Sequence, residues 1–263
     1  MDWSVIVAVH NDEAVLNSTL LRSPVIKGGR RVLCQRNYPS VARAYNAAIR
    51  DCPDDILVFT HPDVYLPGNW CAAFERSLDW LSRNDPQWGV LGLFGISRDG
   101  SGLGFAYSTG IGGFIGVPFA EPCEVRTLDE FVFIVRRSSG LTFDEKIPGA
   151  QSQLCTTDLC LESERRKLRS YVLPCLALHN SNRWNYMPLG FWKSYLYMRN
   201  KWRAALPAQA TYTNITVGCL PMIRNTLRNV LGSKPWKHRV VTRVSDPEAL
   251  YEQVRANLIS AIS

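Results

Sequence analysis

Hydrophobic residues along the first part of the chain form short continuous runs that alternate with helically spaced positions. The runs at 4–9, 31–35 and 55–60 are rich in Val, Ile and Leu, which is typical of strands covered on both faces. Segments 40–52 and 69–84 repeat apolar residues three and four positions apart, which predicts amphipathic helices. This alternation predicts an α/β fold with a parallel sheet and right-handed crossovers.

The pattern changes beyond residue 87, where residues 87–140 are rich in Gly and strand-like. The later elements are predicted as a helix at 157–168, a strand at 171–178, and helices from about 188 onward, including an amphipathic one at 247–262. The longest apolar run, GVLGLFGI, is much shorter than the roughly 18–20 residues that span a bilayer. We expect a domain at 1–185 and a helical extension at 186–263 packed on it.

Charged residues are distributed unevenly along the chain, and the last third is basic. The 263 residues carry a net charge of +7, and residues 181–263 contain 12 Lys and Arg against 3 Asp and Glu. A basic extension of this kind favours phosphate groups: those of nucleotides, anionic lipid headgroups or nucleic acid. The alternative is a solvated surface that keeps the protein in solution. Standard nucleic-acid-binding motifs are absent, so nucleic acid is the least favoured partner.

The eight cysteines include no CxxC pair and no Cys/His cluster at zinc spacing. No basic stretch precedes the first apolar run, which argues against a secretory signal. We therefore expect reduced, mostly buried thiols in a cytoplasmic protein. The basic extension predicts peripheral contact with the inner face of the membrane.

Polar side chains follow several predicted strands, at the edge where ligands bind in open α/β sheets. They are His10 and Asn11 after the first strand, Gln35 after the second, His61 and Asp63 after the third, and His179 after a later one. The glycine-rich patterns GxGxxG after the first strand and GxxxxGK[ST] anywhere are absent, which counts against a dinucleotide dehydrogenase and a P-loop NTPase. A sheet that binds a nucleotide without such loops commonly uses a divalent cation on carboxylates.

Several motifs together resemble a known family. The segment FTHPDVYLP (59–67), preceded by ARAYNAAI (42–49), resembles the glycosyltransferase family 2-like group, and most closely its streptomycin biosynthesis StrF domain branch. LTFDEKIPG, TTDLCLESERR and YVLPCLALHNS then follow in the family's order, so the resemblance covers about residues 4–202. It implies the GT-A fold, a mostly parallel Rossmann-like sheet flanked by helices.

The resemblance also implies roles for individual residues. Asp63 and His179 would hold Mn²⁺ or Mg²⁺, and Asp158 would be the general base of an inverting transfer to an acceptor hydroxyl. The donor would be a nucleoside-diphosphate sugar, and the acceptor a glycan, a lipid-linked molecule or a small molecule. The positions implied for nucleotide-sugar binding are Val9, His10, Asn11, Gln35, Asn46, His61 and Pro62.

The chain departs from the family at three points. His61 stands where the first Asp of the family's Asp-x-Asp element would be, and Thr157 precedes Asp158. Residues 35–37 (QRN) stand where the family's second strand ends in an aspartate that contacts the base or ribose. Asp158 also has a simpler interpretation, because a carboxylate in the first turn of a helix complements the helix dipole. The alternative to an enzyme is a non-catalytic protein that binds a sugar nucleotide or a glycan on the same scaffold.

Overall fold

The structure, a computed structural model, describes residues 2–149, 153–182, 189–232 and 242–262. Its helices are α1 (Glu13–Ser18), α2 (Pro24–Lys27), α3 (Val41–Asp51), α4 (Trp70–Asn84), α5 (Cys155–Arg165), α6 (Leu189–Lys201), α7 (Leu220–Gly232) and α8 (Pro247–Ile262). Its strands are β1 (Trp3–Val9), β2 (Val32–Arg36), β3 (Ile56–Thr60), β4 (Val64–Tyr65), β5 (Val90–Gly92), β6 (Phe94–Ile96), β7 (Gly102–Ser108), β8 (Gly113–Gly116), β9 (Cys123–Val125), β10 (Thr127–Leu128), β11 (Val132–Arg136), β12 (Ser170–Val172), β13 (Ala177–His179), β14 (Ala208–Ala210) and β15 (Thr213–Ile215).

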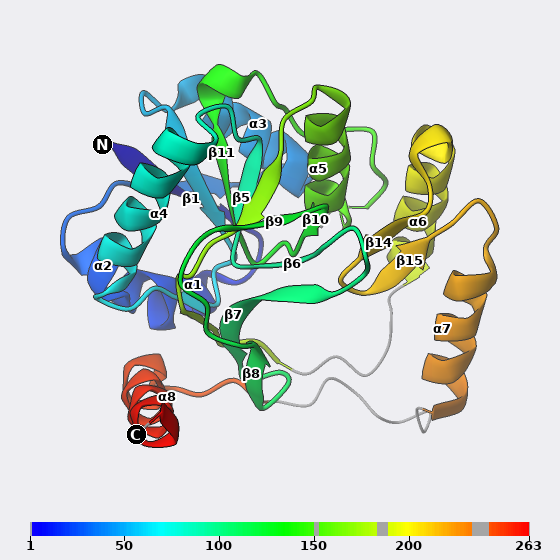
Figure 1. The fold of residues 1–263 in the computed structure, drawn as a ribbon. Helices are drawn as coiled ribbons and strands as arrows, with labels where there is room; N and C mark the ends of the chain where they lie inside the picture. Colours follow the sequence, from blue (N-terminus) through cyan, green and yellow to red (C-terminus); the bar gives the residue numbers. More distant parts are fainter. Residues whose placement is uncertain (1, 150–152, 183–188, 233–241, 263) are drawn as a thin grey trace.

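A seven-stranded sheet in the order β2-β1-β3-β11-β5-β12-β9 forms the centre of the molecule (Figure 1). Strands β2, β1, β3, β5 and β12 run in one direction, whereas β11 and β9 run against them. The predicted α/β fold with helices on the sheet is confirmed. The sheet is mixed rather than fully parallel, because the chain returns through β11 between β3 and β5.

Alternating side chains of the buried strands pack against different helix layers. In β1, Val5, Val7 and Val9 belong to the cluster that holds α1, α2 and α4, whereas Ile6 belongs to the cluster that holds α3, α5 and α6. Successive side chains of a strand point to opposite faces, so helices cover both faces. Ser40 caps α3, because its hydroxyl accepts a hydrogen bond from the Arg43 amide at 3.3 Å.

A second sheet lies at the end of the first where the site forms. Its order is β10-β6-β7-β13-β4, and β8 pairs with the outer part of β7. The strand predicted at 171–178 is therefore wrong as a single element, because it is divided into β12 and β13, which lie in different sheets. Pro174 lies between them and has no N–H to continue a ladder.

The C-terminal part contributes to the main core. Phe191, Tyr195 and Met198 of α6 are buried in the same cluster as α3 and α5, and Ala208 of β14 joins them. The tail also contains the two-stranded sheet β14–β15 besides its helices, and α8 packs through Tyr251 on Tyr65 of β4. The expected boundary at 185/186 lies outside the described residues.

Two further observations concern the cysteines and the helices. All eight cysteines are free, and four of them are buried: Cys52, Cys155, Cys160 and Cys175. Within the described parts of the chain, none of the helices has both the length and the apolar character needed to span a bilayer.

Candidate functional site

A cavity of about 940 Å³ opens where β1, β3 and β13 end. Its lining brings together the predicted residues that follow different strands: Val9, His10, Asn11, Gln35, His61, Pro62, Asp63 and His179. These residues are up to 170 positions apart in sequence, and the sheet topology alone brings them to one edge.

The tight connection between β3 and β4 places His61 and Asp63. The His61 amide donates to the Phe131 carbonyl at 3.0 Å, and the Val64 amide donates back to the His61 carbonyl at 3.3 Å. Strand β13 then pairs with β4 so that His179 lies opposite Val64, next to Asp63. The Asn180 amide donates to the Asp63 carbonyl at 2.8 Å, which fixes this register.

His61, Asp63 and His179 form a compact group of metal-ligating side chains. One ligand atom from each lies within 4.8 Å of the other two. The Nε2 atom of His179 is 3.3 Å from Oδ1 of Asp63, and that oxygen is buried without a well-formed hydrogen bond. An unsatisfied buried carboxylate oxygen beside two imidazoles fits a divalent cation, because such ions take nitrogen and oxygen ligands.

Arg243 reaches the same carboxylate from the end of the chain. Its Nη2 atom lies 2.9 Å from Oδ2 of Asp63, and its Nε donates to the Asn180 carbonyl at 2.8 Å. The buried Asn180 side chain holds this segment through reciprocal hydrogen bonds with the backbone of Val244. Sequence reasoning missed Arg243, because the only signal was the general basic character of the tail.

Charge and burial act against each other in this group. Burial opposes ionisation of Asp63, but the neighbouring imidazoles and the Arg243 guanidinium outweigh it and lower the pKa of that carboxyl. Burial also disfavours a charged His179, yet Asp63 outweighs it and raises the pKa of that imidazole. For His61 burial dominates and lowers the pKa, so this ring stays neutral and available as a ligand.

Two adjacent carboxylates, Asp129 and Glu130, line the cavity on the loop between β10 and β11. Asp129 accepts a hydrogen bond from the Phe131 amide at 3.1 Å. Burial, followed by repulsion from Asp129, raises the pKa of Glu130 to about 8, although backbone amides at the start of α5 partly offset this. One oxygen of Glu130 is buried without a hydrogen-bond partner. Such an environment is typical of a catalytic acid or base.

Asp158 is not in the cavity. It is 2% exposed, and its Oδ1 accepts a hydrogen bond from the Trp202 indole at 2.7 Å. Its Oδ2 accepts one from Lys201 at 2.8 Å, and Lys201 also contacts Asp144 at 2.7 Å. Both oxygens are thus occupied in a network that joins α5 to α6, and the role of Asp158 as general base stays a prediction.

Asn46 also lies outside the cavity lining. Its side chain donates to the Phe143 carbonyl at 2.9 Å and accepts from the Phe143 amide at 2.8 Å. It donates in addition to Glu145 at 2.9 Å. In the structure this side chain fixes the backbone that follows β11, and its role in nucleotide binding stays a prediction.

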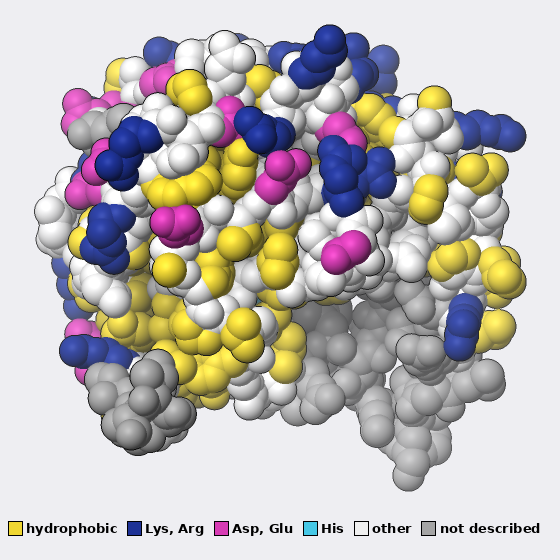
Figure 2. Space-filling view, viewed as in Figure 1, with side chains coloured by type: hydrophobic (Ala, Val, Ile, Leu, Met, Phe, Trp, Pro, Cys, Tyr) yellow, Lys and Arg dark blue, Asp and Glu magenta, His cyan; other side chains and the backbone are white. Residues whose placement is uncertain are grey.

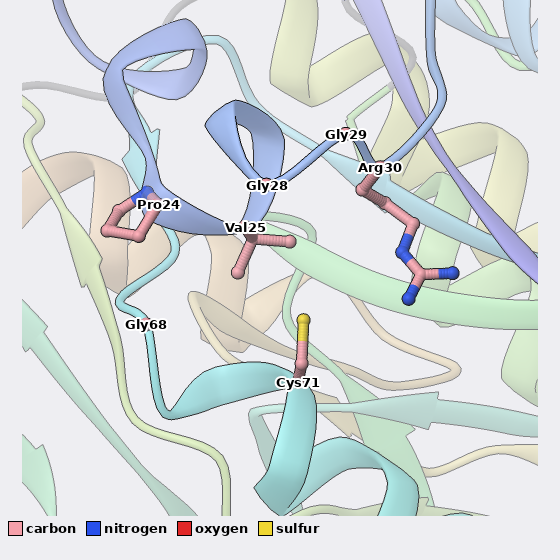
Figure 3. Close-up of a pocket in the computed structure, with 7 residues that line it drawn as sticks. All are labelled: Pro24, Val25, Gly28, Gly29, Arg30, Gly68 and Cys71. Carbon is pink, nitrogen blue, oxygen red and sulfur yellow. The ribbon is translucent and has the colours of Figure 1, made fainter.

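A second, smaller hollow of about 240 Å³ lies between α2 and the start of α4 (Figure 3). Its lining consists of small or apolar side chains, one thiol and one cation: Pro24, Val25, Gly28, Gly29, Arg30, Gly68 and Cys71. Burial raises the pKa of the Cys71 thiol, which disfavours the reactive thiolate. This hollow therefore lacks the acid and base groups of the large cavity.

Comparisons with known proteins give a fold likeness at low identity. Searches of protein-family models and of curated proteins find no match. The crystal structure of S. aureus TarS 1–349 is 14% identical, with a TM-score of 0.47, and the match covers 76% of this chain and 65% of that one. The mannosyltransferase PcManGT from Pyrobaculum calidifontis, in complex with GDP-Man and Mn²⁺, is 13% identical, with a TM-score of 0.42 over 67% and 56%.

A third match is A197 from STIV, at 13% identity and a TM-score of 0.41, covering 70% of this chain and 86% of that one. This chain thus spans about two thirds or less of the lengths of TarS 1–349 and PcManGT. Such identities and scores are too low to transfer a substrate or an activity. Any assignment must rest on the residues of the cavity.

Proposed function

We propose that the protein is a glycosyltransferase of the GT-A type, which moves a sugar from a nucleoside diphosphate to an acceptor hydroxyl in the large cavity. The observation that carries this proposal is the His61–Asp63–His179 group beside Arg243 at the ends of β1, β3 and β13. Three cationic or metal-ligating side chains around one carboxylate form a site for a diphosphate. The cavity volume suits a nucleotide-sized ligand.

His61, Asp63 and His179 would hold a divalent cation. When bound, Mn²⁺ or Mg²⁺ would neutralise the diphosphate and stabilise it as a leaving group. Arg243 lies against the same carboxylate and would supply a fixed positive charge to a phosphate oxygen.

Glu130 replaces Asp158 as the proposed general base. In the transfer, the acceptor oxygen bonds to the anomeric carbon while the bond from that carbon to the diphosphate oxygen breaks, and the hydroxyl proton passes to the Glu130 carboxylate. A base with a pKa of about 8 can take this proton efficiently near neutral pH. Direct displacement of this kind inverts the anomeric centre.

A thermal-shift panel tests donor and cation together. The protein is heated with UDP, GDP, CDP, ADP or TDP, each with Mn²⁺, Mg²⁺ or a chelator. We expect at least one diphosphate with Mn²⁺ to raise the melting temperature, because a ligand that binds only the folded state stabilises it. His61→Ala should remove the shift, whereas Asp99→Ala, in an exposed loop outside the cavity lining, should keep it.

The metal site and the nucleotide donor can be disproved independently of each other. A diphosphate shift that survives the chelator would overturn the metal site, and the absence of any nucleotide shift would overturn the donor. Direct titration of Mn²⁺ into His61→Ala and Asp99→Ala gives a second readout that does not depend on melting.

Glu130→Gln tests the base. Once a donor is identified, this variant should bind it with unchanged affinity but turn it over at least about 100-fold more slowly, since general-base catalysis contributes that much. In the parent protein the rate should rise as pH increases through about 8, because the base acts in its deprotonated form. Exposed Glu124→Gln is the matched control. Unchanged turnover in Glu130→Gln would exclude this role.

One observation favours a second candidate, a sugar-nucleotide-binding protein without transferase activity. Asp158, which the resemblance implies as the base, does not line the cavity and has both carboxylate oxygens hydrogen-bonded to Lys201 and Trp202. This candidate predicts nucleotide-dependent stabilisation with no release of diphosphate from any donor or acceptor tried.

A further inference from the structure

Helix α7 has an outer face that no other described element covers. Leu220, Ile223 and Leu227 are 74%, 44% and 53% exposed, whereas Met222 on the opposite side is fully buried in the main core. Positions separated by three, four and seven residues share one side of a helix, so the three exposed side chains form a row. Val217, which precedes the helix, is 55% exposed as well.

The sequence that contains this row is basic. Arg224 is exposed and lies between Ile223 and Leu227 in the sequence. Residues 165–245 contain 15 Lys and Arg and no Asp or Glu. In Figure 2, hydrophobic side chains with a basic side chain among them gather over the upper part of α7 at the right edge, and no acidic side chain is visible there.

We propose that α7 docks on an anionic membrane surface, with Leu220, Ile223 and Leu227 inserted at the headgroup boundary and Arg224 against lipid phosphates. An exposed apolar row next to cations, on a helix too short and too polar to span the bilayer, is the arrangement of an interfacial helix. This inference does not depend on the proposed enzymatic function.

Two other occupants agree less well with this surface. Nucleic acid would use the cations, but it offers nothing to a row of Leu and Ile side chains, since non-specific binding is electrostatic. A second copy of the chain would bury the apolar row, but it would bring the same basic, acid-free segment against itself, and like charges oppose such a contact.

Vesicle flotation of the full chain tests the proposal. The probes are vesicles of phosphatidylcholine alone and vesicles with about one third phosphatidylglycerol, at about 0.1 M and 0.5 M NaCl. We expect binding only to the anionic vesicles and weaker binding at high salt. Leu220→Ser and Leu227→Ser together should lower the partition coefficient more than about tenfold, since each removes several buried CH₂ groups.

Matched variants test whether vesicle binding depends on this face of α7 or on exposed apolar and basic side chains in general. Val117→Ser is the apolar control, because Val117 is 72% exposed, almost as much as Leu220, but lies just after β8. Arg224→Gln should weaken binding about fivefold, whereas Arg50→Gln, an exposed arginine on α3, should not.

Three outcomes would overturn the proposal: equal binding to neutral vesicles, binding unchanged in the double Leu variant, or a dimer in light scattering that the double variant abolishes. Binding of an oligonucleotide that competes with the vesicles, and that Leu220→Ser leaves unchanged, would also contradict it. Because all substituted side chains are on the surface, melting temperatures of the variants should match the parent protein, and this is measured alongside.

Discussion

At the scale of single residues, three carboxylates of this protein lie in different surroundings, and their contacts differ accordingly. Asp63 contacts Arg243 and His179 in the cavity, Asp158 contacts Lys201 and Trp202 in the interior, and Glu130 borders the cavity with an unpaired oxygen. The family resemblance implied a catalytic role for Asp158, whereas in the structure its partners are Lys201 at the end of α6 and Trp202 just after it. Residue type alone could not reveal this, because both partners are more than 40 positions away.

Asp158→Ala should therefore act on stability. Removing this carboxylate leaves Lys201 partly buried with a single partner and the Trp202 indole without an acceptor, so the free energy of unfolding should fall by about 3 kcal/mol. Chemical denaturation measures this loss. Asp158→Asn, which keeps an acceptor for Trp202, should lose less.

One result for the Asp158 variants would contradict a purely structural role of this carboxylate. If Asp158→Asn unfolds like the parent protein yet abolishes turnover of a donor that it still binds, Asp158 rather than Glu130 takes part in the chemistry. Exposed Glu121→Ala is the reference for a carboxylate without such partners.

At the scale of elements, the β7–β8 hairpin shapes one wall of the cavity through Ile111 and Ile115. It depends on close backbone approach at Gly116, which has φ +76° and where a Cβ would lie 2.0 Å from the Gly104 carbonyl oxygen. No side chain can enter that space without moving the strand, so glycine is required for this pairing.

Gly116→Ala should lower the free energy of unfolding by about 2 kcal/mol or more, through backbone strain and steric overlap. Gly113→Ala, in the same strand, is the matched control, because its Cβ would meet nothing within 4 Å. Urea denaturation of the two variants should separate them clearly. Equal stability would mean that β8 does not pair with β7 in this way.

Helix α5 ends in a cluster whose effect depends on pH. Hydrogen bonds from Arg165 and then Arg166 outweigh burial and lower the pKa of Glu162 to about 2, from an ordinary value of 4.5. A carboxyl with a lowered folded-state pKa stabilises the fold above about pH 4.5, and this contribution is lost as the pH falls from 4.5 towards 2.

Glu162→Gln should accordingly cost about 0.5–1 kcal/mol at pH 7, since Arg165 is largely exposed and solvent screens the pair. The difference from the parent protein should shrink as denaturation is repeated at lower pH, between about 5 and 3.5. A difference that stays constant over this range would show that the carboxylate charge is not responsible.

At the scale of the whole molecule, the sequence predicted the order of elements well. Buried strands such as β1 and β3 and capped helices such as α3 carry local signals in their hydrophobic pattern, and those signals agree with the fold. The cavity-lining residues near strand ends followed from topology. The division of 171–178 into two sheets, the pairing of Asp63 with Arg243 and the burial of Asp158 arise from contacts between distant segments, which no local pattern contains.

The same long-range packing gives a prediction about the tail. A chain ending at residue 185 should lose its cooperative thermal unfolding transition, because it lacks Phe191, Tyr195 and Met198 from the core around α3 and α5. Circular dichroism and calorimetry measure this. A sharp transition in the shortened chain would instead support a separate domain at 1–185.

The contact between Asp63 and Arg243 also implies an order in which the pocket is assembled during synthesis. A ribosome makes the two histidines and Asp63 well before residue 243, so a nascent chain can hold the pocket's acidic centre without its guanidinium partner. The Asn182 side chain can bind the Thr242 amide, and the Asn180 side chain the Val244 backbone, only after that segment has emerged. The electrostatics of this pocket are therefore completed only after Arg243 has been made, and any interruption before Arg243 leaves Asp63 without its guanidinium partner.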